Sequence, residues 1–319
     1  MNEPLFENPY KAMQSGVFAS LDKYMKKDSY WQKENYNPSF LLPGQYQERQ
    51  YILPLSCHYN MLISDTVLDY TQENDTLEDW ISNIKSSSDH ALKNALFELD
   101  NISGNWFQPA ADYNSGQIFF DKEKWSNFAL EYLLLFKQDY LENEKTNNTD
   151  TSSSHILISS LDDINEHTTQ IDIIPDIQGK KMAAIRCFGA VSMASDYKEE
   201  AYHFLMYFLN NVIQESTSTN GMSLSANGVL GTDYPVQVSA IRTKLSFLDQ
   251  SKQDLAIKAF QSLEGAYFPT EVEHFIYEEI IENSSLLYGP QTDFKKIWQD
   301  KLSALADKAW NDYHTQVTE

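Results

Sequence analysis

CFGAVSMASDYKEEAYHFLMYFLNN, residues 187–211, joins a run of small and apolar residues to a segment with strong helical periodicity. The first part is typical of a buried strand. In the second part apolar side chains recur on one helical face, namely at Ala201, Phe204, Leu205, Phe208 and Leu209. Asp196 and Glu199 fit a capping box, in which the aspartate binds amide hydrogens of the first turn. The stretch therefore predicts a strand and then a helix that starts at Asp196 and buries the face carrying Phe204 and Phe208.

Apolar strands and patterned helices alternate along the rest of the chain. Strands are expected at 51–55, where Pro54 indicates an edge position or a strand end, at 60–63, at 155–159 and within 169–195, with a turn at Gln178-Gly179. Helices are expected at 77–84 after Asp75 or Thr76, at 122–144 after Asp121, at 271–288 and at 293–310. This alternation predicts an α/β fold, and 319 residues suit two lobes.

The net charge of −22 argues against nucleic acids and anionic membranes as partners. Nucleic acids and anionic membranes need clustered lysine and arginine, whereas this chain has three arginines, Arg49, Arg186 and Arg242, and no basic run. The two cysteines, Cys57 and Cys187, have no zinc-site spacing. Each lies in an apolar run, which favours two thiols over one disulfide and leaves both alternatives open.

The sequence has no signature of a common catalytic, cofactor or metal site. The patterns G-x-S-x-G, G-x-G-x-x-G, H-E-x-x-H, the P-loop and the EF-hand loop are all missing, so no enzyme activity, cofactor or metal is predicted. Adjacent carboxylates such as Glu278-Glu279 and Asp162-Asp163 are the residue type that glycoside hydrolysis uses. Among 46 acidic residues such pairs are expected by chance, which favours a solvated surface over a glycan-degrading enzyme.

Five segments, taken in order, carry a family resemblance. They are AMQSGVFASLDKYM at 12–25, GQYQERQYILPLSCHYNMLISDTVL at 44–68, IIPDIQGKKMAAIRCFGAVSMASDYKEEAYHFLMYF at 173–208, GTDYPVQVSAI at 231–241 and HFIYEEIIENSSLLYGPQTDFKKIWQDKLSALADKAW at 274–310. In this order the chain resembles the extracellular solute-binding proteins of ABC importers, in particular the carbohydrate-binding group that includes maltose-binding protein. The segment YNMLISDTVL departs from the family's usual sequence after the first crossing strand. In NDTLEDWI, Trp80 lies later than the tryptophan of the corresponding family motif.

The resemblance implies a type 2 periplasmic-binding-protein-like fold, in which two α/β lobes are joined by crossing strands and close on ligand by a hinge motion. Lobe one would comprise 1–57 and 189–268, and lobe two would comprise 58–188 and 269–319. The family opens with a strand, a helix and a second strand ahead of AMQSGVFASLDKYM, a unit of about 30 residues or more. The first lobe is therefore expected to be N-terminally incomplete, with the signal and anchor outside this sequence.

The same resemblance implies a sugar or oligosaccharide as ligand, held near the crossings by aromatic stacking and planar polar side chains. His58 and Tyr59 lie at the first crossing, and Arg186 and Phe188 precede the second. Core packing is the alternative for the aromatic members of this set. Small residues after Phe188, beginning with Gly189, would allow a close crossing, and Cys57 and Cys187 would then lie at one hinge.

Three further residues are expected to contact the ligand. Trp106 lies in a loop of lobe two, and Tyr277 matches the position of a sugar-stacking aromatic in the maltose-binding members, with Ile276 beside it in place of tryptophan. Glu7 falls where the family often places an acidic ligand contact.

The resemblance further implies a monomer that delivers its ligand to the permease subunits of an ABC transporter. Its expected location is extracellular, either anchored as a lipoprotein on the cell surface or periplasmic. The alternative is a cell-surface sensing module of the same fold that serves no importer.

Overall fold

A computed structural model describes residues 6, 8–68, 75–86, 106–146, 156–158, 161–210, 213–214, 234–288 and 293–319. The chain divides into two compact units. Unit 1 comprises Met1–Thr66, Ser159–Ile174 and Lys181–Pro269, and unit 2 comprises Val67–Ile158, Pro175–Lys180 and Thr270–Glu319. Residues 58–66 and 181–188 thus group with unit 1, and the predicted lobe boundaries stay a prediction.

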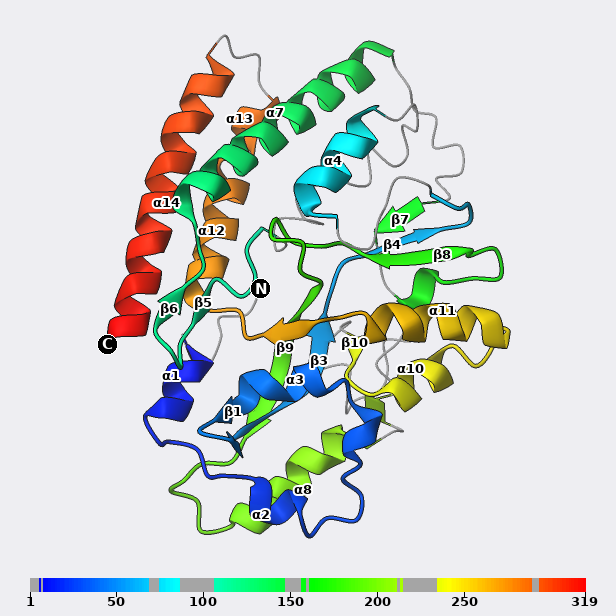
Figure 1. Cartoon of the computed structure of the whole chain (residues 1–319), viewed down its shortest axis with the longest axis vertical. Helices are drawn as coiled ribbons and strands as arrows, with labels where there is room; N and C mark the ends of the chain where they lie inside the picture. Colours follow the sequence, from blue (N-terminus) through cyan, green and yellow to red (C-terminus); the bar gives the residue numbers. More distant parts are fainter. Residues whose placement is uncertain are drawn as a thin grey trace. The chain divides into compact units, whose positions relative to one another are not determined.

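A four-stranded mixed sheet organises unit 1 (Figure 1). Its order is β10 (Tyr234–Pro235), β3 (Ile52–His58), β9 (Met182–Ala190) and β11 (Gly265–Tyr267). β3 is antiparallel to both of its neighbours, whereas β9 and β11 are parallel. Both central strands are rich in buried apolar residues, as expected for strands covered on two faces.

Both alternatives predicted from Pro54, an edge position and a strand end, are wrong, because β3 lies between β10 and β9 and continues past the proline to His58. The proline is tolerated because β10 is only two residues long and pairs with Ser56 and Cys57, beyond the proline. Pro54 itself aligns with Phe188 of β9. The lack of a backbone N–H at Pro54 therefore costs no hydrogen bond between β3 and β10.

The remaining elements of unit 1 are short. The helices are α1 (Pro9–Gln14), α2 (Asp22–Met25), α3 (Pro38–Leu41), α8 (Lys198–Phe208), α10 (Val238–Lys244) and α11 (Gln250–Gln261), with 3-10 turns at Lys33–Asn35, Leu42–Gly44 and Leu161–Asp163. β1 (Gln45–Tyr46) pairs with β2 (Arg49–Gln50), and β4 (Met61–Ser64) pairs with β8 (Gln170–Ile173). Side chains from β3, β9, α3, α8 and α11 meet in one hydrophobic core.

Helix α8 follows β9 as predicted and buries most of the predicted apolar face, but it starts later than predicted and leaves Phe204 exposed. It begins at Lys198 with Tyr197 as N-cap, and no side chain caps it, so the Asp196–Glu199 box is wrong. Phe204 is 62% exposed, whereas Tyr202, Leu205 and Met206 are buried. Leu205, Phe208 and Leu209 of the predicted apolar face are buried, so Phe204 is the residue of that face that the prediction placed wrongly.

Gly189 of β9 lets α8 approach the sheet closely. A Cβ atom at this position would lie 2.3 Å from Cδ2 of Leu205 on α8. The small residue predicted to allow a close crossing therefore also serves the packing of helix on strand within unit 1.

Unit 2 is mainly helical. Its elements are α4 (Leu77–Ser86), β5 (Ala111–Asp112), β6 (Gln117–Ile118), α7 (Lys122–Thr146), β7 (Ile156–Ile158), α12 (Glu271–Glu282), α13 (Ser285–Tyr288) and α14 (Phe294–Thr318). The helix predicted at 271–288 is thus two helices separated by residues 283–284, and the last helix continues to Thr318.

Two predicted caps in unit 2 are confirmed. Asp121 accepts hydrogen bonds from the amides of Glu123 and Lys124, at 3.0 and 2.9 Å, at the start of α7. Thr76 and Asp79 exchange side-chain to backbone hydrogen bonds at the start of α4. Both pairings satisfy amide hydrogens that a first turn cannot satisfy internally.

Tryptophan side chains dominate the core of unit 2. Trp80, Trp106, Trp125 and Trp298 are all fully buried.

The turn predicted at Gln178-Gly179 is confirmed. Gly179 has a φ angle of +81°, and the Asp176 side chain accepts a hydrogen bond from the Lys180 amide at 2.9 Å. No described helix is long and apolar enough to cross a membrane.

Candidate functional site

The last residue of β3, His58, lies beside Tyr234 at the start of β10. The two rings are stacked with centroids 5.5 Å apart and an angle of 9° between their planes. His58 Nε2 is 3.2 Å from Asn60 Oδ1, which holds the ring in place. Burial, and secondly the positive charge of Arg186, lower the pKa of His58 to about 4, against a weaker opposing effect of the Asn60 hydrogen bond. The imidazole is therefore neutral at physiological pH and acts as a polar, uncharged contact.

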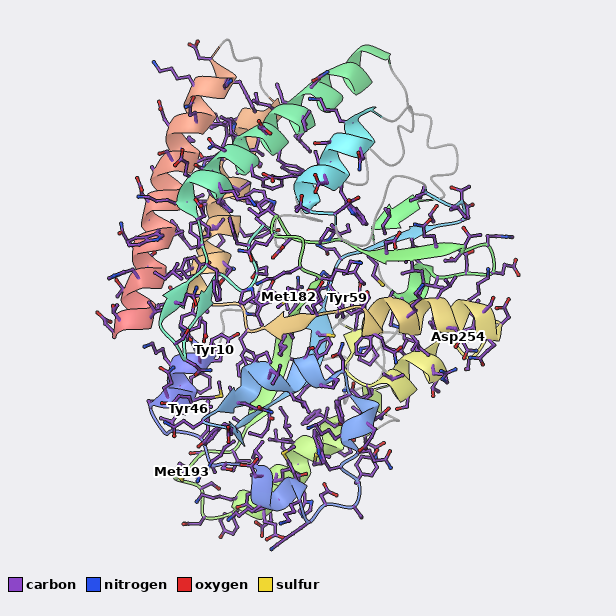
Figure 2. All side chains as sticks on the ribbon, in the orientation of Figure 1. Tyr10, Tyr46, Tyr59, Met182, Met193 and Asp254 are labelled. Atoms are coloured by element: carbon purple, nitrogen blue, oxygen red, sulfur yellow. The ribbon has the colours of Figure 1, made fainter. Side chains whose placement is uncertain are left out.

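Tyr59 follows directly but turns into the core of unit 1. It is 2% exposed, and its ring centroid lies 4.4 Å from that of Tyr234 and 6.3 Å from that of Phe260. Figure 2 labels it beside the end of β3. Its hydroxyl is buried and has no hydrogen-bond partner among the described residues, and burial raises its pKa well above the ordinary value. Packing against Tyr234 is the role that these contacts give Tyr59.

Arg186 and Phe188 lie on β9, next to β3. Arg186 is exposed although β9 is a central strand, and Phe188 is half-buried. Phe188 packs edge-on against Phe268, with ring centroids 4.9 Å apart. Phe268 in turn packs on Tyr10 of α1 at 5.4 Å and donates its backbone N–H to the Tyr10 hydroxyl at 2.9 Å. Phe188, Phe268 and Tyr10 therefore form an aromatic cluster in unit 1 that begins two residues from Arg186.

Of the other predicted site residues, two belong to unit 2 and one lies outside the described residues. Trp106 belongs to unit 2, is 2% exposed and packs against Trp125 at 5.3 Å and Phe128 at 6.0 Å, so its contacts are those of a core residue. Tyr277 is half-buried on α12 of unit 2. Glu7 lies outside the described residues.

Sequence reasoning missed Asn60, Tyr234 and Tyr10. Asn60 directly follows the predicted pair in HYN, and a planar amide beside a histidine and a tyrosine is the usual composition of a polar binding surface. Tyr234 precedes Pro235 in GTDYPVQVSAI, a segment already noted for its resemblance. Tyr10 gave no signal, because its contact with Phe268 joins residues far apart in the sequence.

Both cysteines are free thiols in unit 1. Cys57 is fully buried and Cys187 is half-buried, as favoured by the apolar runs around them. Of the two carboxylate pairs, Asp162 lies 3.1 Å from the Lys244 ammonium and Glu278 lies 2.9 Å from His274 Nε2, so one member of each pair has a partner within the protein. Among the described residues no group of three or more histidine, cysteine or acidic side chains is placed to hold a metal ion.

No protein-family model and no curated protein matches the chain. The chain does match solved structures. An ABC transporter solute-binding protein from Agrobacterium radiobacter, in complex with ribitol, superposes with a TM-score of 0.51 over 95% of this chain and 82% of that chain. The chain has the fold of the ABC solute-binding proteins. The sequence identity in this comparison is 14%, so the likeness is one of fold.

A second solute-binding protein supports the same fold. The sugar-binding protein MalE from Xanthomonas citri is 11% identical, with a TM-score of 0.50 over 94% of this chain and 82% of that chain. The predicted α/β class and the two-lobed periplasmic-binding-protein-like fold are therefore confirmed.

Proposed function

We propose that this protein is the solute-binding component of an ABC importer and that its ligand is a sugar, an oligosaccharide or a related polyol. The observation that carries the proposal is the fold, shared over nearly the whole chain with a ribitol-bound and a sugar-binding protein. In this proposal the protein binds without catalysis and delivers its ligand to permease subunits.

The ligand contacts proposed in unit 1 are His58, Arg186 and Phe188. They combine a neutral imidazole, a guanidinium and the half-buried ring of Phe188. The first two groups can bind sugar hydroxyls, and the ring can pack against a C–H face of the sugar. Tyr277 of unit 2 is proposed as a further aromatic contact, on the strength of the sequence resemblance. Tyr59 and Trp106 are assigned to packing, because both are almost fully buried.

Partner and location follow from the same proposal. The protein acts as a monomer outside the cytoplasm, either periplasmic or attached to the cell surface as a lipoprotein, and docks on its transporter after ligand binding closes the lobes at the hinge. The lobes are proposed at 1–57 with 189–268 and at 58–188 with 269–319.

Ligand-induced thermal stabilisation tests this function. A ligand that binds only the folded protein adds about 2.7 kcal/mol to the free energy of unfolding at a concentration of 100 Kd. We expect a rise in Tm with at least one member of a panel of monosaccharides, oligosaccharides and polyols, measured by differential scanning fluorimetry and followed by calorimetric titration. If every member leaves the Tm unchanged at millimolar concentration, the proposed function is wrong.

A matched pair of phenylalanine variants tests the proposed site. Phe188→Ala is expected to weaken binding of the active ligand by roughly fivefold, because one aromatic contact in such a site is worth about 1 kcal/mol. Phe247→Ala removes a phenylalanine that is exposed elsewhere in unit 1 and should leave the affinity unchanged. Equal affinities for the two variants would remove Phe188 from the site.

A further inference from the structure

A groove of about 280 Å³ lies in unit 2 between α12 and α14, two helices that pack side by side (Figure 1). The helices are antiparallel here, because Lys308 of α14 contacts Phe275 near the start of α12 and Lys301 contacts Asn283 at its end. A helical segment from residue 275 to residue 283 is about 12 Å long, which sets the length of the groove. None of the ligand contacts proposed above lines it.

The floor of the groove is apolar. Ile280, Trp298 and Leu302 form it, and each is at most 2% exposed. The indole N–H of Trp298 is buried and has no hydrogen-bond partner among the described residues, whereas folded proteins pair almost all such groups. An apolar surface with a few polar groups around it is the usual composition of a small-molecule site.

A lysine of α14 closes each end of the groove. The Lys308 ammonium lies 3.1 Å from the centroid of the Phe275 ring and 3.3 Å from Asp312, so it covers a face of that ring. At the other end the Lys301 ammonium donates a hydrogen bond to Asn283 Oδ1 at 2.9 Å. An ammonium has three N–H donors, and this is the one hydrogen bond that Lys301 makes to the described residues. Lys301 therefore keeps N–H donors for a ligand.

Glu279 supplies the negative charge of the groove. It lies between Phe275 and Asn283 along one face of α12, because residues four apart on a helix are neighbours. Its side chain is half-buried and forms no hydrogen bond or ion pair with another described residue. The adjacent Glu278 differs, since its carboxylate is 2.9 Å from His274 Nε2. The groove thus holds a carboxylate and an ammonium, on facing helices, that both have bonding capacity left.

These groups discriminate between classes of ligand. A sugar stacks on an open aromatic face, but Lys308 covers the ring of Phe275, and Trp298 is buried. Glu279 repels a simple anion and Lys301 repels a simple cation. A zwitterion satisfies both charges at once, and an apolar part of the same molecule can cover the floor.

We propose that this groove binds a free α-amino acid with an apolar side chain, such as leucine or phenylalanine. The Glu279 carboxylate accepts hydrogen bonds from the ammonium of the ligand, and Lys301 binds its carboxylate. The side chain of the ligand packs on Ile280, Leu302 and Leu305. Pockets for drug-sized molecules measure about 300–1,000 Å³, so a groove of about 280 Å³ suits a smaller ligand. The inference does not depend on the proposed function.

Analogues of one amino acid test the ligand class. L-leucine, N-acetyl-L-leucine and L-leucinamide are titrated against the full chain and followed by calorimetry and ligand-observed NMR. N-acetyl-L-leucine lacks the ammonium, and L-leucinamide lacks the carboxylate. Each analogue is expected to bind roughly fivefold more weakly than leucine, as for the loss of one exposed ion pair. Glycine, which lacks the apolar side chain, should also bind more weakly than leucine.

Two variants assign the binding to the groove. Glu279→Gln and Lys301→Gln should each weaken leucine binding by roughly fivefold. Glu279→Gln should leave the affinity for N-acetyl-L-leucine unchanged, and Lys301→Gln that for L-leucinamide, because each analogue already lacks the group concerned. The matched controls are Glu282→Gln and Lys296→Gln, at exposed residues of the same two helices outside the groove, and both should bind leucine as the parent protein does.

The outcomes separate this inference from the proposed function. If neither leucine nor phenylalanine binds at millimolar concentration, the inference is wrong and the solute-binding function stands. If leucine binds with the same affinity to the parent protein and to both groove variants, it binds elsewhere and the inference is also wrong. Equal binding of leucine and its two analogues would exclude a site for zwitterions. A saccharide that displaces leucine would show one shared site and would likewise overturn the inference.

Discussion

At the scale of single residues, His58 illustrates how the fold sets the protonation of a side chain. Burial lowers its pKa from 6.5 to about 4, with a smaller contribution from the charge of Arg186. In the unfolded chain the same imidazole titrates near its ordinary value, so between these two pH values only the unfolded state gains the proton. The folded protein therefore loses stability as pH falls through that window.

The first residue-scale prediction concerns this pH dependence. As pH falls from about 6.5 to about 4, His58 should reduce the free energy of unfolding by roughly 3 kcal/mol, because one pKa unit corresponds to about 1.4 kcal/mol. His58→Gln removes the titration and should flatten the pH profile by that amount. Urea unfolding of both proteins across the pH window measures the difference.

An exposed histidine of the same unit supplies the control. His167→Gln, at an exposed histidine 3.5 Å from Glu166, is the matched variant against which the His58→Gln profile is compared. Parallel pH profiles for His58→Gln and the parent protein would show that His58 titrates normally in the folded state.

Sequence information reached some of these residues and missed others for identifiable reasons. His58 and Arg186 were predicted from their places before two crossings in the resemblance, and they do lie on neighbouring strands. The burial of Trp106 was not predictable, because the aromatic residues that cover it, such as Trp125 and Phe128, follow it by some twenty residues on a separate helix. Neither local pattern nor composition contains such a contact.

At the scale of elements, α12 shows a cap that is buried and reciprocal. Glu273 Oε2 accepts the backbone N–H of Thr270 at 2.7 Å and also the Thr270 hydroxyl, while Oε1 accepts the Tyr313 hydroxyl of α14 at 3.0 Å. The carboxylate thus starts one helix and ties it to another. Burial raises its pKa, and these hydrogen bonds oppose the rise.

The element-scale prediction is that Glu273→Ala destabilises unit 2 by about 3 kcal/mol, because it leaves three partly buried donors without their acceptor. Glu273→Gln, which keeps an acceptor oxygen, should cost less. Chemical denaturation followed by circular dichroism measures both. Glu271→Ala, an exposed residue in the same first turn, is the control and should change stability by no more than about 1 kcal/mol.

A loss no larger for Glu273→Ala than for Glu271→Ala would show that the cap adds nothing beyond helix-end electrostatics.

Two helix starts were identified from the residues that cap them, and a third was placed wrongly because its expected cap is not formed. Asp121 and Thr76 accept first-turn amides and were identified from the sequence, whereas α8 starts at Lys198 without a side-chain cap. The Asp196–Glu199 spacing was a chance match to the capping box. The local irregularity in the pairing of β3 with β9, near Ser56, was also beyond the sequence, because register depends on two strands at once.

At the scale of the whole molecule, the order of segments along the chain was more informative than any one motif. Five weak matches in sequence order predicted the fold that two solved structures share at 14% and 11% identity. The two compact units place 181–188 with 189–269, whereas the predicted lobes separate them at 188. Because β9 continues across residue 188, the sequence has no change of composition there that would mark a lobe boundary.

The molecule-scale prediction concerns the net charge of −22. Like charges repel most in the compact state, and salt screens this repulsion. Raising the ionic strength from about 10 mM to about 300 mM, where the Debye length falls from about 30 Å to below 10 Å, should therefore raise the Tm. A rise of roughly 2–4 °C, or about 1 kcal/mol, is expected from differential scanning calorimetry.

Sodium chloride and potassium chloride at equal ionic strength serve as mutual controls, since screening depends on ionic strength and not on the cation. A constant or falling Tm would mean that attractive surface ion pairs, such as Lys122 with Asp307, outweigh the repulsion.

The tryptophan-rich core of unit 2 makes the protein's intrinsic fluorescence spatially selective. Five of the six tryptophans, Trp80, Trp106, Trp125, Trp298 and Trp310, belong to unit 2, and Trp31 alone belongs to unit 1. Indole emission therefore reports on one half of the molecule almost exclusively, without any label. Replacing Trp31 would leave a purely unit 2 signal, and the tyrosine-rich unit 1 can then be followed by an extrinsic dye on the half-buried thiol of Cys187, so that the two halves are observed in separate optical channels.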